Sequence, residues 1–253
     1  MWERWIFMLK RVVIKLSGEA IGSSTSETGY ADDIIKNIVS QIKQVMEGGT
    51  QVALVIGGGN HWRGVQDHSG IDRVKSDQMG MLATIMNAIY LSEAFKSQGQ
   101  KSRIVTPMIF GNMSSVYDKD SALFWMNNGE VLINAAGLAH PMFSTDTVTA
   151  LRAAELEADC ILFAKNVDAV YDSDPKNNPN ARKFKTLNYD TAITKRLQVA
   201  DIAAMHLSNV ERIPSYVFGL NKPKSIIQAC AYPNTTLNGT YIYVDVEDEF
   251  YDN

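Results

Sequence analysis

Short apolar runs alternate with longer stretches of helical period along most of this chain. Apolar positions at helical spacing predict helices at Tyr30–Glu47, Asp77–Phe95, Thr147–Ala158 and Ile202–Glu211. Strands that are apolar on both faces and alternate with helices predict an α/β protein, a three-layer sandwich with a mainly parallel central sheet and helices on both faces. Continuous apolar runs predict these strands at Arg11–Leu16, Gln51–Ile56, Ser102–Thr106, Glu130–Asn134, Cys160–Ala164, Ser215–Phe218 and Thr240–Asp245.

Two of the helical stretches carry more detailed expectations. We expect Asp32 or Asp33 to cap the first, and the pair Gly48-Gly49 to stop it. The apolar stripe of the first helix comprises Ile35, Ile38, Val39, Ile42, Val45 and Met46. In the second helix the stripe comprises Leu82, Ile85, Met86 and Ile89, a pattern more typical of a core than of an interface.

Composition favours one cytoplasmic domain spanning residues 1–253. With 45% hydrophobic residues the chain can bury a substantial core, and a formal net charge of −4 gives no indication of a nucleic-acid partner. Cys160 and Cys230 are far apart in the sequence, which argues against a disulfide framework or a thiolate zinc site. The N-terminal segment does not read as a signal peptide, and no apolar run is long enough to predict a membrane span.

Two glycine-containing segments follow predicted strands. Lys15-Leu16-Ser17-Gly18 ends the first strand, at the sheet edge where open α/β proteins bind ligands, although a surface lysine before a turn fits the segment equally well. Gly57-Gly58-Gly59 follows the second strand and exposes consecutive backbone N–H groups, which suit phosphate oxygens, while a tight turn is the plain alternative. Arg63, four residues further on, is a candidate phosphate ligand or a solvated surface charge.

Two later segments add weaker signals. Phe143-Ser144-Thr145-Asp146-Thr147 precedes a predicted helix, where the same residues serve as an N-cap or as an anion site. In the segment 167–175, Tyr171 is a candidate to pack on an adenine and Asp174 to bind a ribose hydroxyl, while a turn with a packed tyrosine is the plain alternative. The stretch 172–185, rich in Asn, Asp and Pro, reads as a loop within the domain.

Taken together, these segments resemble the bacterial UMP kinase family of the amino-acid-kinase superfamily from about Leu9 to about Asp245. Its DQMGMLAT segment is more specific to this family than the glycine motif. The strings that carry the resemblance are VIKLSGEA at 13–20, VALVIGGGNHWRG at 52–64, DRVKSDQMGMLATIMNA at 72–88, FSTDT at 143–147, ALRAAELEAD at 150–159, VDAVYDSDPK at 167–176 and VFGLNKP at 217–223.

The resemblance implies transfer of the γ-phosphoryl group of ATP to UMP in pyrimidine nucleotide biosynthesis. It implies an acceptor lobe at about 8–164, an ATP lobe at about 165–245, and Mg²⁺ held largely by ATP phosphates and water rather than by a protein cage. The catalytic residues would be Lys15, Asp146 and Lys165. The ATP site would comprise Lys15, Leu16, Ser17, Gly18, Gly59, Arg63, Lys165, Tyr171 and Asp174. The UMP site would comprise Gly58, Asp77, Leu138, Ala139, His140, Pro141, Met142, Phe143, Ser144 and Thr145.

The chain departs from the pattern of its relatives at two places. Leu138, Ala139 and His140 stand where many relatives have Thr, Gly and Asn in the loop that faces uracil, so base selectivity would depend on backbone contacts or on His140 as a donor. Ala169 replaces a usual glycine, and a positive φ there would be strained.

Partners and alternatives follow from the same resemblance. It implies a homohexamer regulated by nucleoside triphosphates such as GTP and UTP. One alternative is a kinase of the same superfamily that acts on a carboxylate or carbamate, and the DQMGMLAT segment argues against it. The other is a nucleotide-binding sensor or storage protein of this fold without turnover, which the altered 138–140 loop motivates and the retained Lys15 and Asp146 oppose.

Overall fold

The computed structural model describes residues 9–62, 70–231 and 239–252. Its strands are β1 Arg11–Leu16, β2 Gln51–Ile56, β3 Ser102–Thr106, β4 Ser115–Val116, β5 Val131–Asn134, β6 Cys160–Lys165, β7 Phe184–Asn188, β8 Ser215–Gly219, β9 Thr240–Tyr243 and β10 Glu249–Phe250. Its helices are α1 Gly18–Ile21, α2 Asp32–Glu47, α3 Arg73–Ser97, α4 Lys119–Asn127, α5 Thr145–Glu155, α6 Tyr189–Thr194, α7 Ile202–Val210 and α8 Ser225–Cys230.

The described strands form one ten-stranded sheet in the order β10-β7-β9-β8-β6-β1-β2-β5-β3-β4. The pairs from β8 through β6, β1, β2, β5 and β3 to β4 are all parallel, and antiparallel pairing occurs where β9 meets β8 and β10 meets β7. The mainly parallel sheet predicted from the sequence is therefore confirmed.

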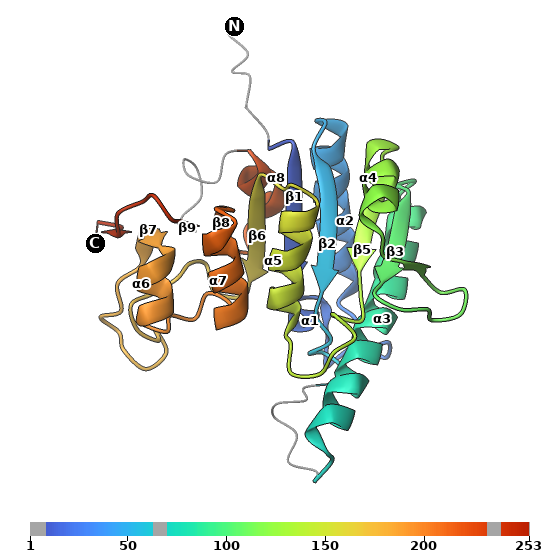
Figure 1. The fold of residues 1–253 in the computed structure, drawn as a ribbon, viewed down its shortest axis with the longest axis horizontal. Helices are drawn as coiled ribbons and strands as arrows, with labels where there is room; N and C mark the ends of the chain where they lie inside the picture. The colour runs from blue at the N-terminus through green and yellow to red at the C-terminus, as the bar shows by residue number, and fades with distance from the viewer. Residues whose placement is uncertain (1–8, 63–69, 232–238, 253) are drawn as a thin grey trace, which may run out of the picture.

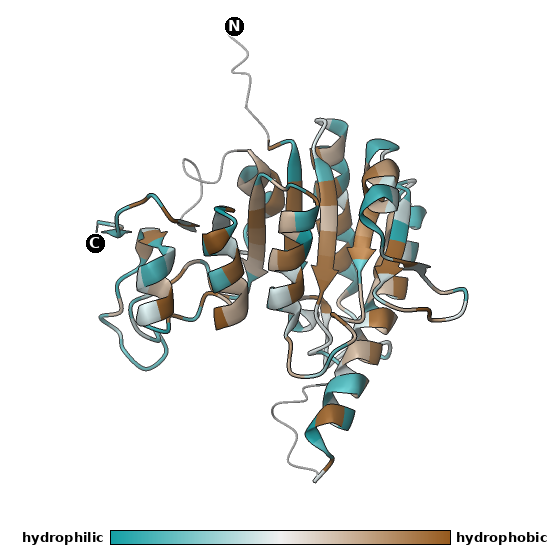
Figure 2. Ribbon diagram, in the orientation of Figure 1, coloured by the Kyte–Doolittle hydropathy of each residue, from teal (hydrophilic) through white to brown (hydrophobic). Residues whose placement is uncertain are grey.

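Helices cover both faces of this sheet, which makes three layers (Figure 1). One face packs against α4, α5, α6 and α7, and the other against α2, α3 and α8. Residues alternate between the two cores along each strand. Val13 belongs to the first core, and its neighbours Val12 and Ile14 belong to the second. The central strands are hydrophobic along almost their whole length (Figure 2), because both of their faces are buried.

The order of strands has its switch point at β1, because β2 is added on one side of it and β6 on the other. Both of these strands run parallel to β1. The carboxyl ends of β1, β2, β5 and β6 lie along the lower edge of the sheet in Figure 1. Loops that leave this edge on opposite sides of β1 open a crevice, which is where open α/β sheets bind their ligands.

The first long helix differs from expectation only at its cap. Ala31 is the N-cap residue of α2 and makes no side-chain capping bond, so the prediction that Asp32 or Asp33 caps the helix is wrong. Both aspartates lie in the first turn, where their charge favours the helix dipole. Asp32 is also bonded to the hydroxyl of Tyr90 on α3, which draws its carboxylate away from the cap position.

The second long helix, α3, differs from the prediction in its start and in the burial of its apolar stripe. It begins at Arg73, where the Asp72 side chain accepts a hydrogen bond from the Lys75 N–H. Of the predicted core stripe Ile85 is buried, but Leu82 and Met86 are each 53% exposed and Ile89 is 38% exposed. The buried residues of α3 are Ile85, Leu91 and Phe95, which belong to the core, together with the small or polar Ser76, Ala83, Thr84, Asn87 and Ala88.

Several short elements had no clear signal in the sequence. They are α1, α4, α6, α8, β4, β7 and β10. The predicted loop 172–185 is irregular up to Lys183, and β7 begins at Phe184. Among the described residues, none of the helices has the length and apolarity needed to cross a lipid bilayer.

Candidate active site

Lys15 and Asp146 form an ion pair at the carboxyl edge of the sheet. Lys15 is the penultimate residue of β1, and Asp146 lies in the first turn of α5, which packs on the same face of the sheet. Lys15 Nζ lies 2.7 Å from Asp146 Oδ1, and the two side chains are only 14% and 16% exposed. The pair places two opposite charges together where both side chains are mostly shielded from water.

A second lysine comes from the neighbouring strand. Lys165 ends β6, and its Nζ donates hydrogen bonds to the backbone carbonyls of Gln198, at 3.3 Å, and Val199. Burial lowers the pKa of Lys165, and the charge of Lys15 lowers it further, while Asp146 acts in the opposite direction. Lys15, Asp146 and Lys165 line one cleft together with Ser17 and Glu19. The structure thus brings together the three residues predicted to be catalytic.

The turn after β1 is packed tightly against the turn after β2. Ser17 caps α1 by accepting a hydrogen bond from the Ala20 N–H. A Cβ atom on Gly18 would lie 2.6 Å from the Gly59 backbone nitrogen, so only glycine fits there. Leu16 is fully buried, and its carbonyl accepts a hydrogen bond of 2.9 Å from the Gly57 N–H. The backbone of Leu16 therefore holds the second glycine turn, and its side chain lies in the core and does not line the cleft.

The second glycine turn also lies directly against α3. A Cβ atom on Gly58 would lie 2.7 Å from the Gly80 carbonyl oxygen and 2.9 Å from the Ala83 side chain. The glycine is required because helix and turn meet at backbone distance. Arg63, predicted to bind phosphate, lies outside the described residues.

A pocket of about 250 Å³ opens between this turn, α3 and the start of α5. The predicted acceptor residues that line it are Gly58, Asp77, Phe143, Ser144 and Thr145. Trp62, Gly80, Met81, Thr84 and Gly137 complete the lining.

Asp77 and Ser144 fix the walls of this pocket. The Asp77 carboxylate accepts a hydrogen bond of 2.9 Å from the Met142 N–H and pairs with Arg73 at 3.0 Å. Ser144 caps α5 through the Asp146 N–H, which confirms the helix cap predicted in this segment. The N-terminus of α5, at Thr145, therefore lies at the pocket, and a helix N-terminus favours anions.

The rest of the predicted acceptor loop lies beside the pocket. Leu138, Ala139, His140 and Pro141 are not among the residues that line it, and Met142 lines the adjoining groove. Leu138 packs on the core that faces α5, and His140 is exposed. Ala136, Ala139 and Met142 adopt positive φ values of 61°, 57° and 73°. Such strained non-glycine backbone is concentrated at functional sites more than elsewhere.

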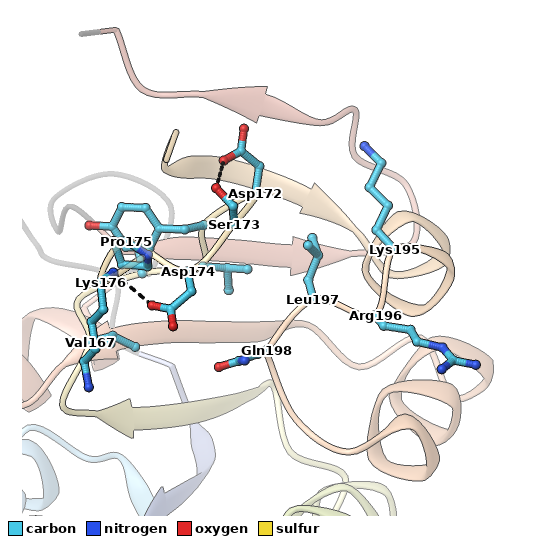
Figure 3. Close-up of a pocket in the computed structure, with 13 residues that line it drawn as sticks. Val167, Asp172, Ser173, Asp174, Pro175, Lys176, Lys195, Arg196, Leu197 and Gln198 are labelled. Carbon is cyan, nitrogen blue, oxygen red and sulfur yellow. Dashed lines mark hydrogen bonds between the residues drawn. The ribbon is translucent and has the colours of Figure 1, made fainter. Parts of the chain in front are cut away.

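A further pocket of about 330 Å³ adjoins the cleft, with which it shares Val167 and Gln198 (Figure 3). The segment 167–176, which contains Tyr171 and Asp174, forms one wall, and residues 195–198 form the other. Ala169 is buried in this wall without a positive φ, so the strain expected at this position is absent.

Tyr171 and Asp174 are held rigidly within their wall. The Tyr171 hydroxyl donates to Asp168 Oδ1 at 2.8 Å, and burial together with this bond raises the pKa of Tyr171 to about 12. Asp174 accepts hydrogen bonds of 2.9 Å from the Lys176 N–H and from the Asn177 side chain. Both predicted residues therefore line the pocket in fixed positions.

The structure also identifies supporting residues that the sequence analysis missed. Thr84 on α3 accepts a hydrogen bond of 2.7 Å from the Ala136 N–H. Asp201 caps α7 and also accepts hydrogen bonds from the hydroxyls of Ser144 and Thr147, which ties the start of α5 to α7. These contacts join residues more than fifty positions apart, so the local pattern of the sequence gave no signal for them.

The chain is similar to proteins of known family. Residues 10–219 match the family model described as the amino acid kinase family. A uridylate kinase from Mycoplasmopsis synoviae (strain 53) is 43% identical over 223 residues, covering 87% of this chain and 93% of that protein. A crystal structure of UMP kinase from Bacillus anthracis has a TM-score of 0.90 and 32% identity, covering 97% of this chain and all of that one. UMP kinase from Ureaplasma parvum has a TM-score of 0.84 and 33% identity over 92% of this chain and 98% of its own. The family match over most of the chain, together with these relatives, shows that the chain belongs to the amino acid kinase family.

Proposed function

We propose that this protein is an ATP:UMP phosphotransferase, which forms UDP and ADP in pyrimidine nucleotide biosynthesis. The observation that carries the proposal is the meeting of Lys15, Asp146 and Lys165 in a cleft at the switch point of the sheet. One pocket near this cleft is built from residues 58–145, and another from residues 167–198. The relatives named uridylate kinase or UMP kinase cover almost the whole chain, which supports UMP as the acceptor.

The pocket lined by residues 167–176 and 195–198 is the proposed site for the ATP nucleoside. Tyr171 offers an aromatic face to adenine, and Asp174 lies where a ribose hydroxyl would bind. The triphosphate would then pass Lys165 toward the turn at Ser17 and Gly18. Because Gly18 and Gly59 lack side chains, the donor and acceptor turns meet at backbone distance.

The pocket beneath α3 is the proposed site for UMP. Asp77 would accept hydrogen bonds from the ribose, and the N–H groups of Gly58 and Thr145 would face the phosphate. Leu138–Pro141 lie next to this pocket, so we assign base recognition to the backbone of the strained 136–142 loop. The division into an acceptor lobe at about 8–164 and an ATP lobe at about 165–245 follows from the same assignment.

The chemistry of phosphoryl transfer needs alignment and positive charge more than a covalent partner. The phosphate oxygen of UMP is already anionic at neutral pH, so no general base is required. Lys15 and Lys165 would stabilise the charge that spreads over the transferred group, and Asp146 holds Lys15 in place.

The cleft also suits the metal that accompanies ATP. Mg²⁺ prefers one or two carboxylates, with phosphates and water as its other ligands. Glu19 and Asp146 are the carboxylates that line this cleft. Among the described residues, no group of three or more His, Cys, Asp or Glu side chains forms a metal cage. When bound with ATP, Mg²⁺ supplies further neutralisation of the phosphate charge.

We further propose that the chain forms a homohexamer in the cytoplasm and responds to nucleoside triphosphates such as GTP and UTP. The exposed apolar stripe of α3 supports self-association, because Met79, Leu82, Met86 and Ile89 recur along one face of that helix. Regulation is testable by adding GTP or UTP to the assay below. A change in kcat or in the UMP concentration dependence would support it, and unchanged kinetics would contradict it.

The test of the catalytic proposal is coupled ADP release with Mg-ATP and each of UMP, CMP, AMP and GMP. We expect strong preference for UMP. Turnover with none of them, from folded protein that binds ATP, would favour a sensor or storage protein instead.

The acceptor site has its own test in Asp77→Asn. We expect this substitution to raise the KM for UMP by about 10-fold or more, because a charged hydrogen-bond acceptor is lost, and to leave the KM for ATP nearly unchanged. Equal changes for both nucleotides would remove Asp77 from the acceptor site.

A further inference from the structure

An amide pair lies where the two glycine turns meet α3. Asn87 on α3 is completely buried. Its Nδ2 donates to the Gly57 carbonyl oxygen and to Asn60 Oδ1, both at 2.7 Å, and its Oδ1 accepts from Asn60 Nδ2 at 3.0 Å. Every donor of the buried amide is thereby used, which offsets the cost of its burial.

The Asn60 side chain extends the pair to the donor turn. A Cβ atom on Gly18 would lie 2.5 Å from Asn60 Oδ1, and a Cβ atom on Gly22 would lie 2.6 Å from Asn60 Cβ. Asn60 thus fills the space between α1 and α3. The turn at Gly57, held by Asn87, and the turn at Gly18, in contact with Asn60, therefore share one fixed support.

We infer that Asn60 and Asn87 are positioning residues, which hold the donor turn at Ser17–Gly18 and the acceptor turn at Gly57–Gly59 in the spacing that phosphoryl transfer requires. The inference rests on the proposed kinase function. Neither asparagine lines the clefts assigned to nucleotide, so both act through the turns. A shift of about 1 Å between reacting groups lowers a rate by about 100-fold, because in-line transfer depends on alignment.

The test compares Asn60→Ala, Asn87→Ala and the double variant with Gln41→Ala. Gln41 is a matched control, since it is a buried amide whose Oε1 accepts from the Ile226 N–H at 2.9 Å and ties α2 to α8. We expect kcat to fall about 10- to 100-fold in each asparagine variant, with the KM for both nucleotides changed by less than about threefold. The double variant should lose no more kcat than Asn87→Ala alone, because both side chains act as one unit. Gln41→Ala should lose thermal stability and keep its kcat.

Two outcomes would overturn the inference while leaving the kinase function intact. One is an unchanged kcat in folded asparagine variants, and the other is a multiplicative loss in the double variant. If Asn87→Ala does not fold, the test uses Asn60→Asp instead, since Asn60 is partly exposed. This substitution replaces the Asn60 amide that donates to Asn87 Oδ1 by a carboxylate, which can only accept. Its kcat relative to wild type should recover as the pH falls and the carboxyl is protonated, and a flat ratio would contradict the inference. Absence of turnover in the wild-type protein would instead refute the proposed function, and the inference with it.

Discussion

Individual residues in the cleft concentrate charge where water is largely excluded. Lys15 pairs with Asp146, and Lys165 is anchored by backbone carbonyls, which are dipoles rather than counter-ions. Lys165 therefore keeps positive charge that is only partly compensated, which agrees with its lowered pKa. A phosphate that enters the cleft would supply the missing negative charge.

Replacement of Lys15 tests the central charge. We expect Lys15→Ala to lower kcat by about 100-fold or more, as is typical when one preorganised donor to a transition state is removed. Circular dichroism should show an unchanged fold, since Lys15 lies at the carboxyl end of β1 and belongs to neither hydrophobic core. Lys36→Ala, at an exposed position on α2, is the matched control. Turnover near that of the control would exclude Lys15 from the mechanism.

The lowered pKa of Lys165 predicts an alkaline limit to activity. The folded protein releases this proton below the ordinary lysine value of 10.5, so kcat/KM for ATP should fall with rising pH before an exposed lysine would titrate. Lys165→Arg should remove that limb, because arginine stays charged. A limb of unchanged position in Lys165→Arg would assign it to another group.

The same shift has a defined effect on stability. Above the folded pKa of Lys165 and below 10.5, the unfolded chain binds more protons than the folded one. The Lys165 contribution therefore penalises folding at neutral pH, and the penalty is relieved as the pH rises through this window.

The sequence located residues at the ends of regular elements but not the contacts that these elements make across the fold. Lys15, Gly58, Asp146 and Lys165 lie at or next to the ends of predicted strands and helices, and they line the cleft or the pocket between α3 and α5. Asn87, by contrast, appears in the sequence as one polar residue in a helix. Its partner Gly57 is thirty positions away, and only the packing of α3 on the glycine turn reveals the contact.

At the scale of elements, α3 serves two surfaces at once. On its inner face, Asp77 accepts a hydrogen bond from the Met142 N–H and Thr84 accepts one from the Ala136 N–H. Asn87 on the same face donates to the Gly57 carbonyl oxygen. Its outer face is apolar and exposed. Hydrophobic periodicity located the helix but assigned its apolar stripe to the core, since periodicity cannot distinguish a core from an interface.

Substitutions on the outer face of α3 test self-association. We expect Leu82→Glu with Met86→Glu to reduce the molar mass measured by light scattering, because charge on both residues opposes burial of the stripe. Ile34→Glu, at an exposed apolar position on α2, is the control. An oligomer that survives both charges would exclude this face as an interface, whereas a monomeric wild type would refute the homohexamer itself.

At the scale of the whole molecule, one sheet passes beneath both proposed nucleotide sites. β1 pairs with β2 on one side and with β6 on the other, and the pairing continues from β6, at the end of the proposed acceptor lobe, to β8 in the proposed ATP lobe. The sequence predicted a mainly parallel sheet but not the order of its strands, and this order joins the two proposed lobes. Short β7 and β10 extend the sheet at its ATP end, and their weak sequence signals reflect their length.

This continuity predicts a single cooperative unfolding transition. Since the pairing of β6 with β8 crosses the proposed lobe boundary near residue 165, neither proposed lobe can lose its strands without exposing the core of the other. UMP and ATP should each raise the same melting temperature, and each should add about 2.7 kcal/mol of stability at roughly 100 times its Kd. Calorimetry with either nucleotide, both and neither measures this directly. Two transitions, of which UMP moves one and ATP the other, would show that the lobes fold independently and that the shared sheet does not couple them.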